Sequence, residues 1–321
     1  MPGLYSQKEE YELITALKGR GEVPLKFAYF GKGAERWAKI EASSQDQKKR
    51  GLEFYERRLF SAKMEQILNT FGNLGKLNLI DIGCGFGSDV YPVLDYLKKT
   101  KKVKKVSYTP IDISEQMLKL AGRNIEKGYN VRVVPNRLDF ESGNISEITS
   151  KSRRDGYSNL LMFMGSTLGN QSDMTRVLSN FRDSMTSEDY LIVGTELLAR
   201  HKISTIIKEY YNRRIVYDLV FTPLGYYGVR QKDGKYMVRF NDNLNQVEAY
   251  FILNKDIRFN IGKDDVALYK GEEILLFKST KFSDWGIAKI FSSTGYRIES
   301  LMSNPENNYA LVLCQPSRFR F

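Results

Sequence analysis

The residues LNLIDIGCGFGSDV, numbers 77–90, carry the clearest indication of the fold class of this chain. The apolar run 77–82 has the length and composition of a buried β-strand. It ends at three closely spaced glycines, Gly83, Gly85 and Gly87, after which the pattern becomes helical. Glycine lets the backbone turn tightly at positive φ and lets a ligand approach with no Cβ in the way. The segment therefore predicts a strand, a glycine turn and a helix, which is where nucleotide-like cofactors bind on α/β sheets.

The spacing of the glycines indicates which cofactor. A dinucleotide fingerprint has the pattern G-x-G-x-x-G, whereas this chain has G-x-G-x-G with Asp81 two residues before the first glycine. That pattern resembles motif I of class I S-adenosylmethionine (SAM) methyltransferases. We expect Cys84, which lies inside the turn, to pack there and to contact the cofactor as well. A tight strand-to-helix turn with no ligand is the alternative.

The composition is that of an ordinary globular protein, with 321 residues, 42% of them hydrophobic and 27% charged, enough for one large domain or two. No apolar run approaches the roughly 18 residues that suggest a membrane span. The N-terminal residues show no apolar signal-peptide segment, so we expect a cytoplasmic protein without a membrane partner. One histidine, His201, and two distant cysteines, Cys84 and Cys314, argue against a metal centre, a Ser-His-Asp triad and a disulfide framework.

The net charge of +11 is compatible with a nucleic-acid partner. The densest basic run, KKTKKVKK at 98–105, has no interleaved aromatic residue on which a base could stack. We therefore interpret the run as a solvated loop and keep nucleic-acid binding as an alternative.

Strands and helices alternate along the middle of the chain, which predicts an α/β fold with a parallel, doubly wound sheet. The expected strands are 77–82, 105–111, 131–135, 157–164 and 189–195, and the expected helices are 88–97, 116–127 and 173–185. Two further helices are expected before this region, at 9–18 and 45–69.

After residue 198 the alternation stops. A helix at 202–217 is followed by half-buried antiparallel strands at 246–252, 257–259 and 273–281. A helix at 285–293 and strands at 295–302 and 309–314 then resemble the closing antiparallel hairpin of class I methyltransferases. We expect a Rossmann-like SAM-binding domain of residues 61–200 and 287–321, and an α+β substrate-binding domain of residues 1–60 and 201–286.

Ligands of a doubly wound sheet lie beyond the carboxyl ends of its strands. After the second strand, Asp112, followed by Ile113, can accept hydrogen bonds from both ribose hydroxyls, although it could also be a helix cap. After the third strand, Asp139 can accept the adenine amino group while the ring of Phe140 packs on the base. An ordinary loop at Asp139 is the alternative. The fourth strand ends in the small residues expected beside the sulfonium, Gly165, Ser166 and Thr167.

The segment FMGSTLGN at 163–170 closely resembles the FLGSTIGN motif of the histidine Nα-methyltransferases of the ergothioneine pathway and their relatives, the fungal dimethylallyltryptophan N-methyltransferases. Further matches follow in the same order over nearly the whole chain. They are KFAYFGKGAERWAKI at 26–40, PIDIS at 110–114, LDF at 138–140, EYYNRRIVYDLVF at 209–221, VEAYFI at 247–252 and GEEILLFKSTKF at 271–282.

The resemblance implies roles for several residues of this chain. The asparagine and tyrosine with which that family holds an amino acid's α-amine and carboxylate match Asn170 and Tyr211. A pocket tyrosine from the N-terminal region matches Tyr55, with Tyr29 near the mouth, and the serine of the S-x-K motif matches Ser279. The resemblance also implies SAM as the cofactor and a small-molecule amine or amino acid as the partner.

Two positions depart from the family pattern. Where the histidine methyltransferases place a glutamate that can hold the imidazole, this chain has Phe277, which would leave the imidazole N–H unpaired. A family lysine after the glycine turn aligns near Asp89, and Arg58 or Lys63 could replace it at the SAM carboxylate. We therefore expect an N-methyltransferase that acts on an amino acid or related amine other than histidine. The alternatives are an RNA or protein methyltransferase that uses the basic surface, and a SAM-binding protein without catalysis.

Overall fold

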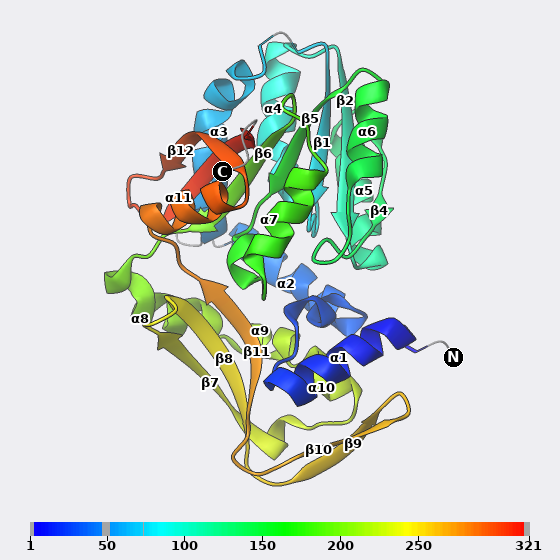
Figure 1. Cartoon of the computed structure of the whole chain (residues 1–321), viewed down its shortest axis with the longest axis vertical. Coiled ribbons are helices and arrows are strands. Elements are labelled where there is room, and N and C mark those ends of the chain that lie inside the picture. Colours follow the sequence, from blue (N-terminus) through cyan, green and yellow to red (C-terminus); the bar gives the residue numbers. More distant parts are fainter. Residues whose placement is uncertain (1–2, 47–51, 73, 318–321) are drawn as a thin grey trace. The chain divides into compact units, whose positions relative to one another are not determined.

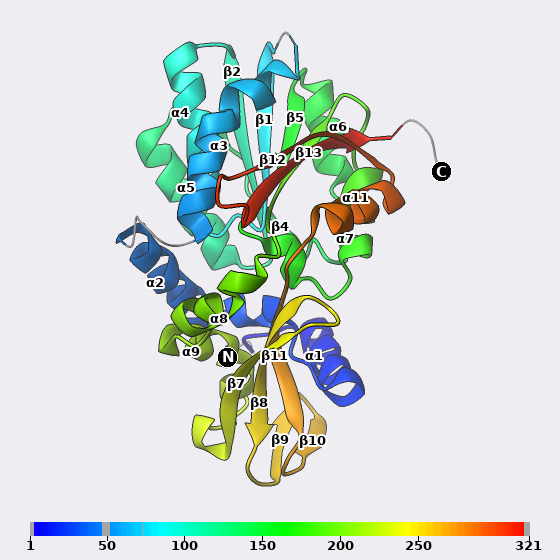
Figure 2. The same cartoon turned by 90° about the vertical axis from the view of Figure 1, so that its left-hand side faces the viewer.

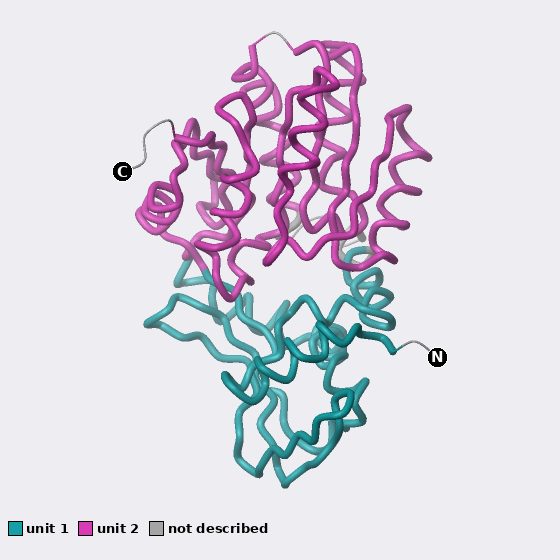
Figure 3. The backbone as a smooth tube through the Cα atoms, turned by 45° about the vertical axis from the view of Figure 1, so that its right-hand side comes forward, with its two compact units in different colours: residues 1–46, 199–280 teal, residues 47–198, 281–321 magenta. Residues whose placement is uncertain are grey.

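The computed structural model describes residues 3–46, 52–72 and 74–317. The chain divides into two compact units (Figure 3): unit 1 contains residues 1–46 and 199–280, and unit 2 contains residues 47–198 and 281–321. The division expected from the sequence put residues 47–60, 199–200 and 281–286 in the other part. Helix α3 (Leu52–Asn69) explains the first difference, because Leu59, Phe60 and Met64 pack into the core of unit 2. The roles of the two units as cofactor and substrate domains stay predictions.

In the described part of unit 2, eight strands form one sheet in the order β12-β13-β6-β5-β1-β2-β3, with β4 also paired to β2 (Figure 1). The parallel strands are β1 (Lys76–Ile82), β2 (Lys105–Asp112), β3 (Arg132–Val133), β4 (Asn136–Arg137), β5 (Ser158–Phe163) and β6 (Tyr190–Glu196). Strands β12 (Tyr296–Ser303) and β13 (Tyr309–Pro316) form the antiparallel hairpin, with β13 against β6. This order and the closing hairpin confirm the predicted fold class.

Helices cover both faces of this sheet (Figure 2). One face carries α3, α4 (Tyr91–Thr100) and α5 (Glu115–Gly128), and the other carries α6 (Ser146–Arg154), α7 (Met174–Asp183) and α11 (Asp284–Ser293). Because successive side chains of a strand point to opposite faces, Leu79 belongs to the first core and Ile80 to the second. The short helices η2 (Ser88–Val90) and η3 (Thr167–Asn170) follow β1 and β5.

Unit 1 contains a three-stranded antiparallel sheet, β11-β8-β7, and a separate hairpin. The sheet strands are β7 (Gly234–Asn241), β8 (Gln246–Leu253) and β11 (Glu273–Thr280), and the hairpin strands are β9 (Ile257–Ile261) and β10 (Asp264–Leu268). The helical elements are α1 (Gln7–Arg20), η1 (Leu25–Tyr29), α2 (Lys32–Asp46), η4 (Arg200–Lys202), α8 (Ile203–Ile206), η5 (Ile207–Tyr211), α9 (Arg214–Val220), α10 (Thr222–Tyr226) and η6 (Gln231–Asp233).

Three expected elements differ in the structure. The single strand expected at 131–135 is two short strands, β3 and β4, on either side of Pro135, which has no N–H to donate to a neighbouring strand. The helix expected at 202–217 changes to a π-helix at η5 and stops before α9. Within the helix expected at 45–69, α2 ends at Asp46, α3 begins at Leu52, and residues 47–51 lie outside the described residues. No helix among the described residues is long and apolar enough to cross a membrane.

Candidate active site

The glycine turn after β1 has the backbone geometry that its sequence predicts. Gly83, Gly85 and Gly87 all have positive φ, at 71°, 48° and 72°. The N–H groups of Gly83 and Cys84 donate to the Ile111 carbonyl at 2.8 and 3.2 Å, which ties the turn to β2. A Cβ on Gly87 would lie 2.7 Å from the Tyr108 hydroxyl, so no other residue fits there without a shift.

The Cys84 thiol is inside this turn and is buried. Burial, reinforced by the nearby carboxylates of Asp112 and Asp81, raises its pKa well above its ordinary value. The thiol therefore stays protonated near neutral pH, which makes Cys84 a packing residue and a poor nucleophile.

Asp112, the last residue of β2, points back toward the glycine turn. Its carboxylate accepts from the N–H of Ser114 at 2.8 Å and from the N–H of Gly85 at 3.4 Å. Burial raises its pKa to about 6, against the opposing effect of these backbone hydrogen bonds. The N-cap of α5 is Ser114, whose side chain accepts from Met117. Ile113, between the two, is buried.

The segment after β4 brings Phe140 to the glycine turn. A Cβ on Gly83 would lie 3.5 Å from the Phe140 ring and 3.9 Å from the Thr167 methyl group, so the three residues converge. The Phe140 ring also packs edge-on against Phe163, with ring centroids 5.4 Å apart. Asp139 accepts from the N–H of Glu141 and the hydroxyl of Ser142, so its carboxylate also supports its own turn.

The segment after β5 turns sharply beside this cluster. Gly165 and Ser166 both have positive φ, at 68° and 57°, and the Thr167 hydroxyl donates to the Met164 carbonyl at 2.6 Å. The Gly165 N–H donates to the carboxylate of Glu56, a buried residue of α3. Sequence reasoning missed Glu56.

A signal for Glu56 was nevertheless present. Glu56 falls at helical spacing before Phe60 and Met64, so it lies on the apolar stripe of α3 and not on its solvated face.

Unsatisfied polar atoms gather at this edge of the sheet. Among the described residues, six buried side-chain polar atoms lack a hydrogen-bond partner. Four of them belong to this edge. The atoms of Asn170 and Gln171 follow β5, that of Thr195 is at the carboxyl end of β6, and that of Tyr309 is at the start of β13. Because buried polar groups are rarely left unpaired, this concentration indicates a place where a polar ligand binds.

Asp89, which aligns near the lysine of the family pattern, lies close to a positive charge in the structure. Burial raises the pKa of Asp89, and the positive charge of Arg57 on α3 opposes that rise. Arg57 is therefore a basic group of α3 near this turn, and the roles of Arg58 and Lys63 at the SAM carboxylate stay predictions.

Unit 1 holds the other expected substrate residues. Tyr211 is buried at the end of the π-helix η5, a distortion that is frequent at functional sites. Its ring packs against Phe277, with centroids 5.2 Å apart. A β-bulge at Leu276 lies between the paired residues Leu275 and Phe277, and Phe277 and buried Ser279 face the same side of the sheet.

Tyr29 and Tyr55 belong to different units. The Tyr29 ring packs edge-on against Trp37 beside the small core of unit 1 formed by η1, α2 and α9. Tyr55, on α3, packs against the core of unit 2. Asn170, at the end of η3, also belongs to unit 2, and its side-chain oxygen is one of the unpaired atoms described above.

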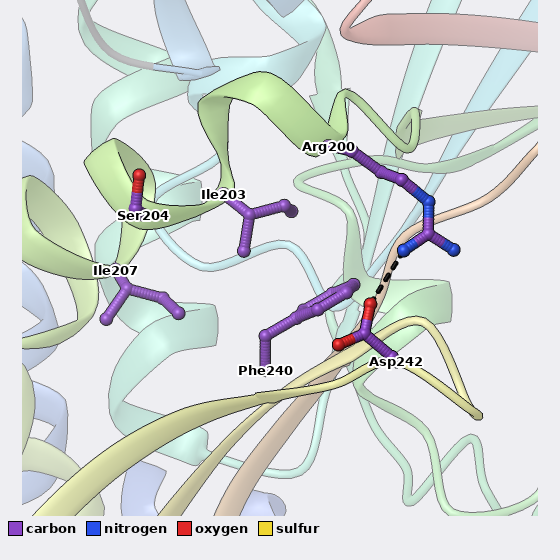
Figure 4. A pocket seen from close by; sticks show the side chains of 6 residues that line it. All are labelled: Arg200, Ile203, Ser204, Ile207, Phe240 and Asp242. Carbon is purple, nitrogen blue, oxygen red and sulfur yellow. Dashed lines mark hydrogen bonds and ion pairs between the residues drawn. The ribbon is translucent and has the colours of Figure 1, made fainter.

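Unit 1 also has a surface pocket of about 310 Å³ next to η5. Ile203, Ile207 and Phe240 form its apolar lining (Figure 4). Arg200 and Asp242 border it and form an ion pair at 2.7 Å, and Ser204 supplies a hydroxyl.

The residues at the edge of the unit 2 sheet fit a nucleoside cofactor. The glycine turn offers a backbone that no side chain covers at the glycines. The buried carboxylate of Asp112 can accept from a hydroxyl, and the ring of Phe140 offers an apolar surface. The unpaired polar atoms beside them have no partner within the described residues.

Several solved structures that are similar to this chain are methyltransferases. A SAM-dependent methyltransferase from Clostridium acetobutylicum is 11% identical, with 81% of this chain and 92% of that chain covered and a TM-score of 0.46. The magnesium protoporphyrin IX methyltransferase from Synechocystis, with bound S-adenosylhomocysteine, is 13% identical, with 90% and 96% covered and a TM-score of 0.47. The glycopeptide N-methyltransferase MtfA is 7% identical, with 80% and 93% covered and a TM-score of 0.40.

No curated protein matches the sequence of this chain. The model of one protein family, described as histidine-specific, SAM-dependent methyltransferases, matches residues 9–316, which is nearly the whole chain. The glycine turn, the strand order and this match lead to one conclusion: the chain belongs to the histidine-specific methyltransferase family, and it is a methyltransferase that uses SAM as its cofactor.

Proposed function

We propose that this enzyme transfers a methyl group from SAM to the amine of an amino acid or related small molecule, and that histidine is not the acceptor. The observation that carries the proposal is the contact between Tyr211 and Phe277. The family resemblance puts an imidazole-holding glutamate at the position of Phe277, and here an aromatic ring packs on the neighbouring tyrosine instead. An imidazole N–H facing this ring would lose its hydrogen-bond partner, which such sites penalise by large factors.

The residues proposed to hold the cofactor are those at the edge of the unit 2 sheet. When bound, SAM supplies a methyl group on a sulfonium. Asp112 would accept from the ribose hydroxyls, and Asp139 and Phe140 would hold the adenine. The backbone of Gly83, Cys84, Gly85 and Gly87, together with Ile113, Gly165, Ser166 and Thr167, would line the remainder.

The amine must be oriented and must be neutral before it can attack. Asn170 offers a buried side-chain oxygen without a partner, which can accept from an amine N–H and fix the direction of the nitrogen lone pair. Alignment of this kind can contribute roughly 7–11 kcal/mol to catalysis. Tyr211 is the second proposed orienting residue. Tyr29, Tyr55, Phe277 and Ser279 are proposed to contact the acceptor.

Titration calorimetry tests the proposal. S-adenosylhomocysteine is added first, and a panel of amino acids that includes histidine and tryptophan follows in the same cell. We expect the cofactor product to bind, at least one amino acid with an apolar or aromatic side chain to bind after it, and histidine to give no heat. Tight histidine binding would contradict the role given to Phe277.

A reciprocal variant sharpens this test. Phe277→Glu restores the carboxylate of the family pattern and should give the protein measurable affinity for histidine while weakening its preferred acceptor. Phe277→Gln is the matched control without the charge. Methylation of RNA or protein through the basic surface, the alternative from the sequence, is not favoured by the family match.

A further inference from the structure

The surface pocket of unit 1 has the size and composition of a small-molecule site. Its volume of about 310 Å³ is near the lower end of the range for ligand pockets. Ile203 and Ile207 line one side and Phe240 lines the opposite side (Figure 4), so the interior is apolar. None of the residues proposed above to hold the acceptor or the cofactor lines this pocket.

The pocket shares a sheet face with one of the proposed acceptor residues. Phe240 on β7 is paired with Val247 on β8, and Val247 is paired with Ser279 on β11. Because paired residues of neighbouring strands point to the same side of a sheet, the three side chains form one row. Two strand spacings separate the ends of this row, so Phe240 and Ser279 lie roughly 10 Å apart.

The pocket also shares a helix with a second proposed acceptor residue. Ile207 begins the π-helix η5 and Tyr211 ends it, so the two are close to one helical turn apart. The Tyr236 hydroxyl donates to the Tyr211 carbonyl at 3.0 Å, which ties the end of η5 to β7, the strand that carries Phe240. The same two elements therefore hold the pocket and Tyr211.

The rim of the pocket is polar but carries balanced charges. The Arg200 guanidinium pairs with Asp242 at 2.7 Å and also donates to the side-chain oxygen of Asn245 at 3.2 Å. An ionised group on a ligand would meet a cation that already has an anionic partner, and the apolar interior would not compensate its lost hydration. The pocket therefore favours an uncharged, mainly apolar group.

We propose that this pocket receives the far end of the acceptor's side chain, and that the acceptor is an α-amino acid whose side chain is long, uncharged and mainly apolar. With its amine beside Tyr211 and Ser279, such a molecule needs a side chain of roughly 10 Å to reach Phe240. Amino acids with shorter apolar side chains would leave the pocket unfilled and would bind more weakly. The inference rests on the proposed function and narrows it to one class of acceptor.

The test measures, by calorimetry, how tightly straight-chain α-amino acids from alanine to α-aminodecanoic acid bind the wild-type protein saturated with S-adenosylhomocysteine. Each methylene buried in the pocket should strengthen binding about three- to fourfold, so α-aminodecanoic acid should bind at least about tenfold more tightly than norleucine. α-Aminosuberic acid, which ends in a second carboxylate, should bind at least about tenfold more weakly than α-aminooctanoic acid, which has the same chain length.

Substitutions at η5 test whether the pocket causes this dependence on length. Ile207→Trp fills the pocket and should abolish the gain beyond norleucine, while norleucine itself binds within about twofold of its wild-type affinity. Ile206→Trp is the matched control, because Ile206 precedes Ile207 and does not line the pocket, and it should keep the full dependence. Ile207→Ser removes apolar lining without adding bulk and should reduce the gain. Circular dichroism checks that each variant is folded.

Three results would overturn the inference while the proposed function stands. They are an affinity that does not rise with side-chain length, equal behaviour of Ile207→Trp and Ile206→Trp, and equal binding of α-aminosuberic and α-aminooctanoic acids. Equal losses for norleucine and α-aminodecanoic acid in Ile207→Trp would also overturn it, because the substitution would then only disturb η5. If S-adenosylhomocysteine binds and no amino acid does, the proposed function itself fails and the inference fails with it, which is a different outcome.

Discussion

Lowering the pH from 8 to 5 should weaken cofactor binding, because it protonates Asp112. Burial raises the pKa of this carboxyl from 3.8 to about 6. If only the carboxylate accepts the ribose hydroxyls, the binding-competent fraction of the protein is nearly complete at pH 8 and about one tenth at pH 5. The apparent dissociation constant of S-adenosylhomocysteine should therefore rise about tenfold over this range. Calorimetry of this ligand at intervals of half a pH unit measures the change.

The raised pKa of Asp112 also predicts how stability depends on pH. The predicted dependence has the opposite sign from that of a salt-bridged aspartate. A raised pKa means that the folded protein binds this proton more tightly than the unfolded chain does. The contribution of Asp112 to the free energy of unfolding should therefore decrease as the pH rises from about 4 to about 6. The shift of about two pKa units corresponds to roughly 3 kcal/mol.

The control for both effects is Asp112→Asn, which cannot titrate. It should bind S-adenosylhomocysteine more weakly than the wild-type protein at pH 8 but with little further loss between pH 8 and pH 5. Circular dichroism at each pH confirms that the protein is folded. A wild-type protein that binds equally well at pH 5 and pH 8, or a variant that keeps the full pH dependence, would refute the assignment of Asp112 to the ribose.

Three substitutions give further predictions. Gly87→Ala places a methyl group at a positive φ and 2.7 Å from the Tyr108 hydroxyl, so urea denaturation should show a loss of about 2–4 kcal/mol, whereas Gly128→Ala, which meets no atom within 4 Å, should change stability by less than about 1 kcal/mol. Asn170→Ala should lower turnover ~10²-fold while the cofactor dissociation constant changes less than about twofold, and an equal loss of both would be inconsistent with an amine-orienting role. Lys281→Met removes the buried partner 2.6 Å from Glu196 and should lower the free energy of unfolding by about 3–5 kcal/mol, and unchanged stability would show that the pair does not support the fold.

The central sheet could be predicted because strands and helices alternate along the sequence and most of the strands contain runs of apolar residues. The mainly apolar runs at β1, β5 and β6 are stable between two helical layers, and the glycine turn after β1 indicates where the first helix begins. Local sequence is sufficient there. The proposed cofactor residues follow from the same pattern, since they lie at the carboxyl ends of those strands.

The structure around the proposed substrate residues was harder to predict from the sequence, because it depends on tertiary contacts. Residues 207–211 have an ordinary helical pattern, and no proline or glycine marks the π-helix that ends at Tyr211. Nothing in the apolar run around Leu276 indicates the β-bulge that the structure has there. Strand β7 was not expected, because its residues are only half-buried or exposed and their pattern is weak. Glu56 needed the packing of α3 to show that its side chain is inside.

Transfer of an isotopically labelled methyl group tests the central claim most directly. The protein is incubated with SAM carrying a labelled methyl and an equimolar mixture of the common amino acids, and mass spectrometry locates the label. We predict a product labelled on the α-nitrogen of an amino acid with an apolar or aromatic side chain, and none on histidine. Label on histidine would contradict the account.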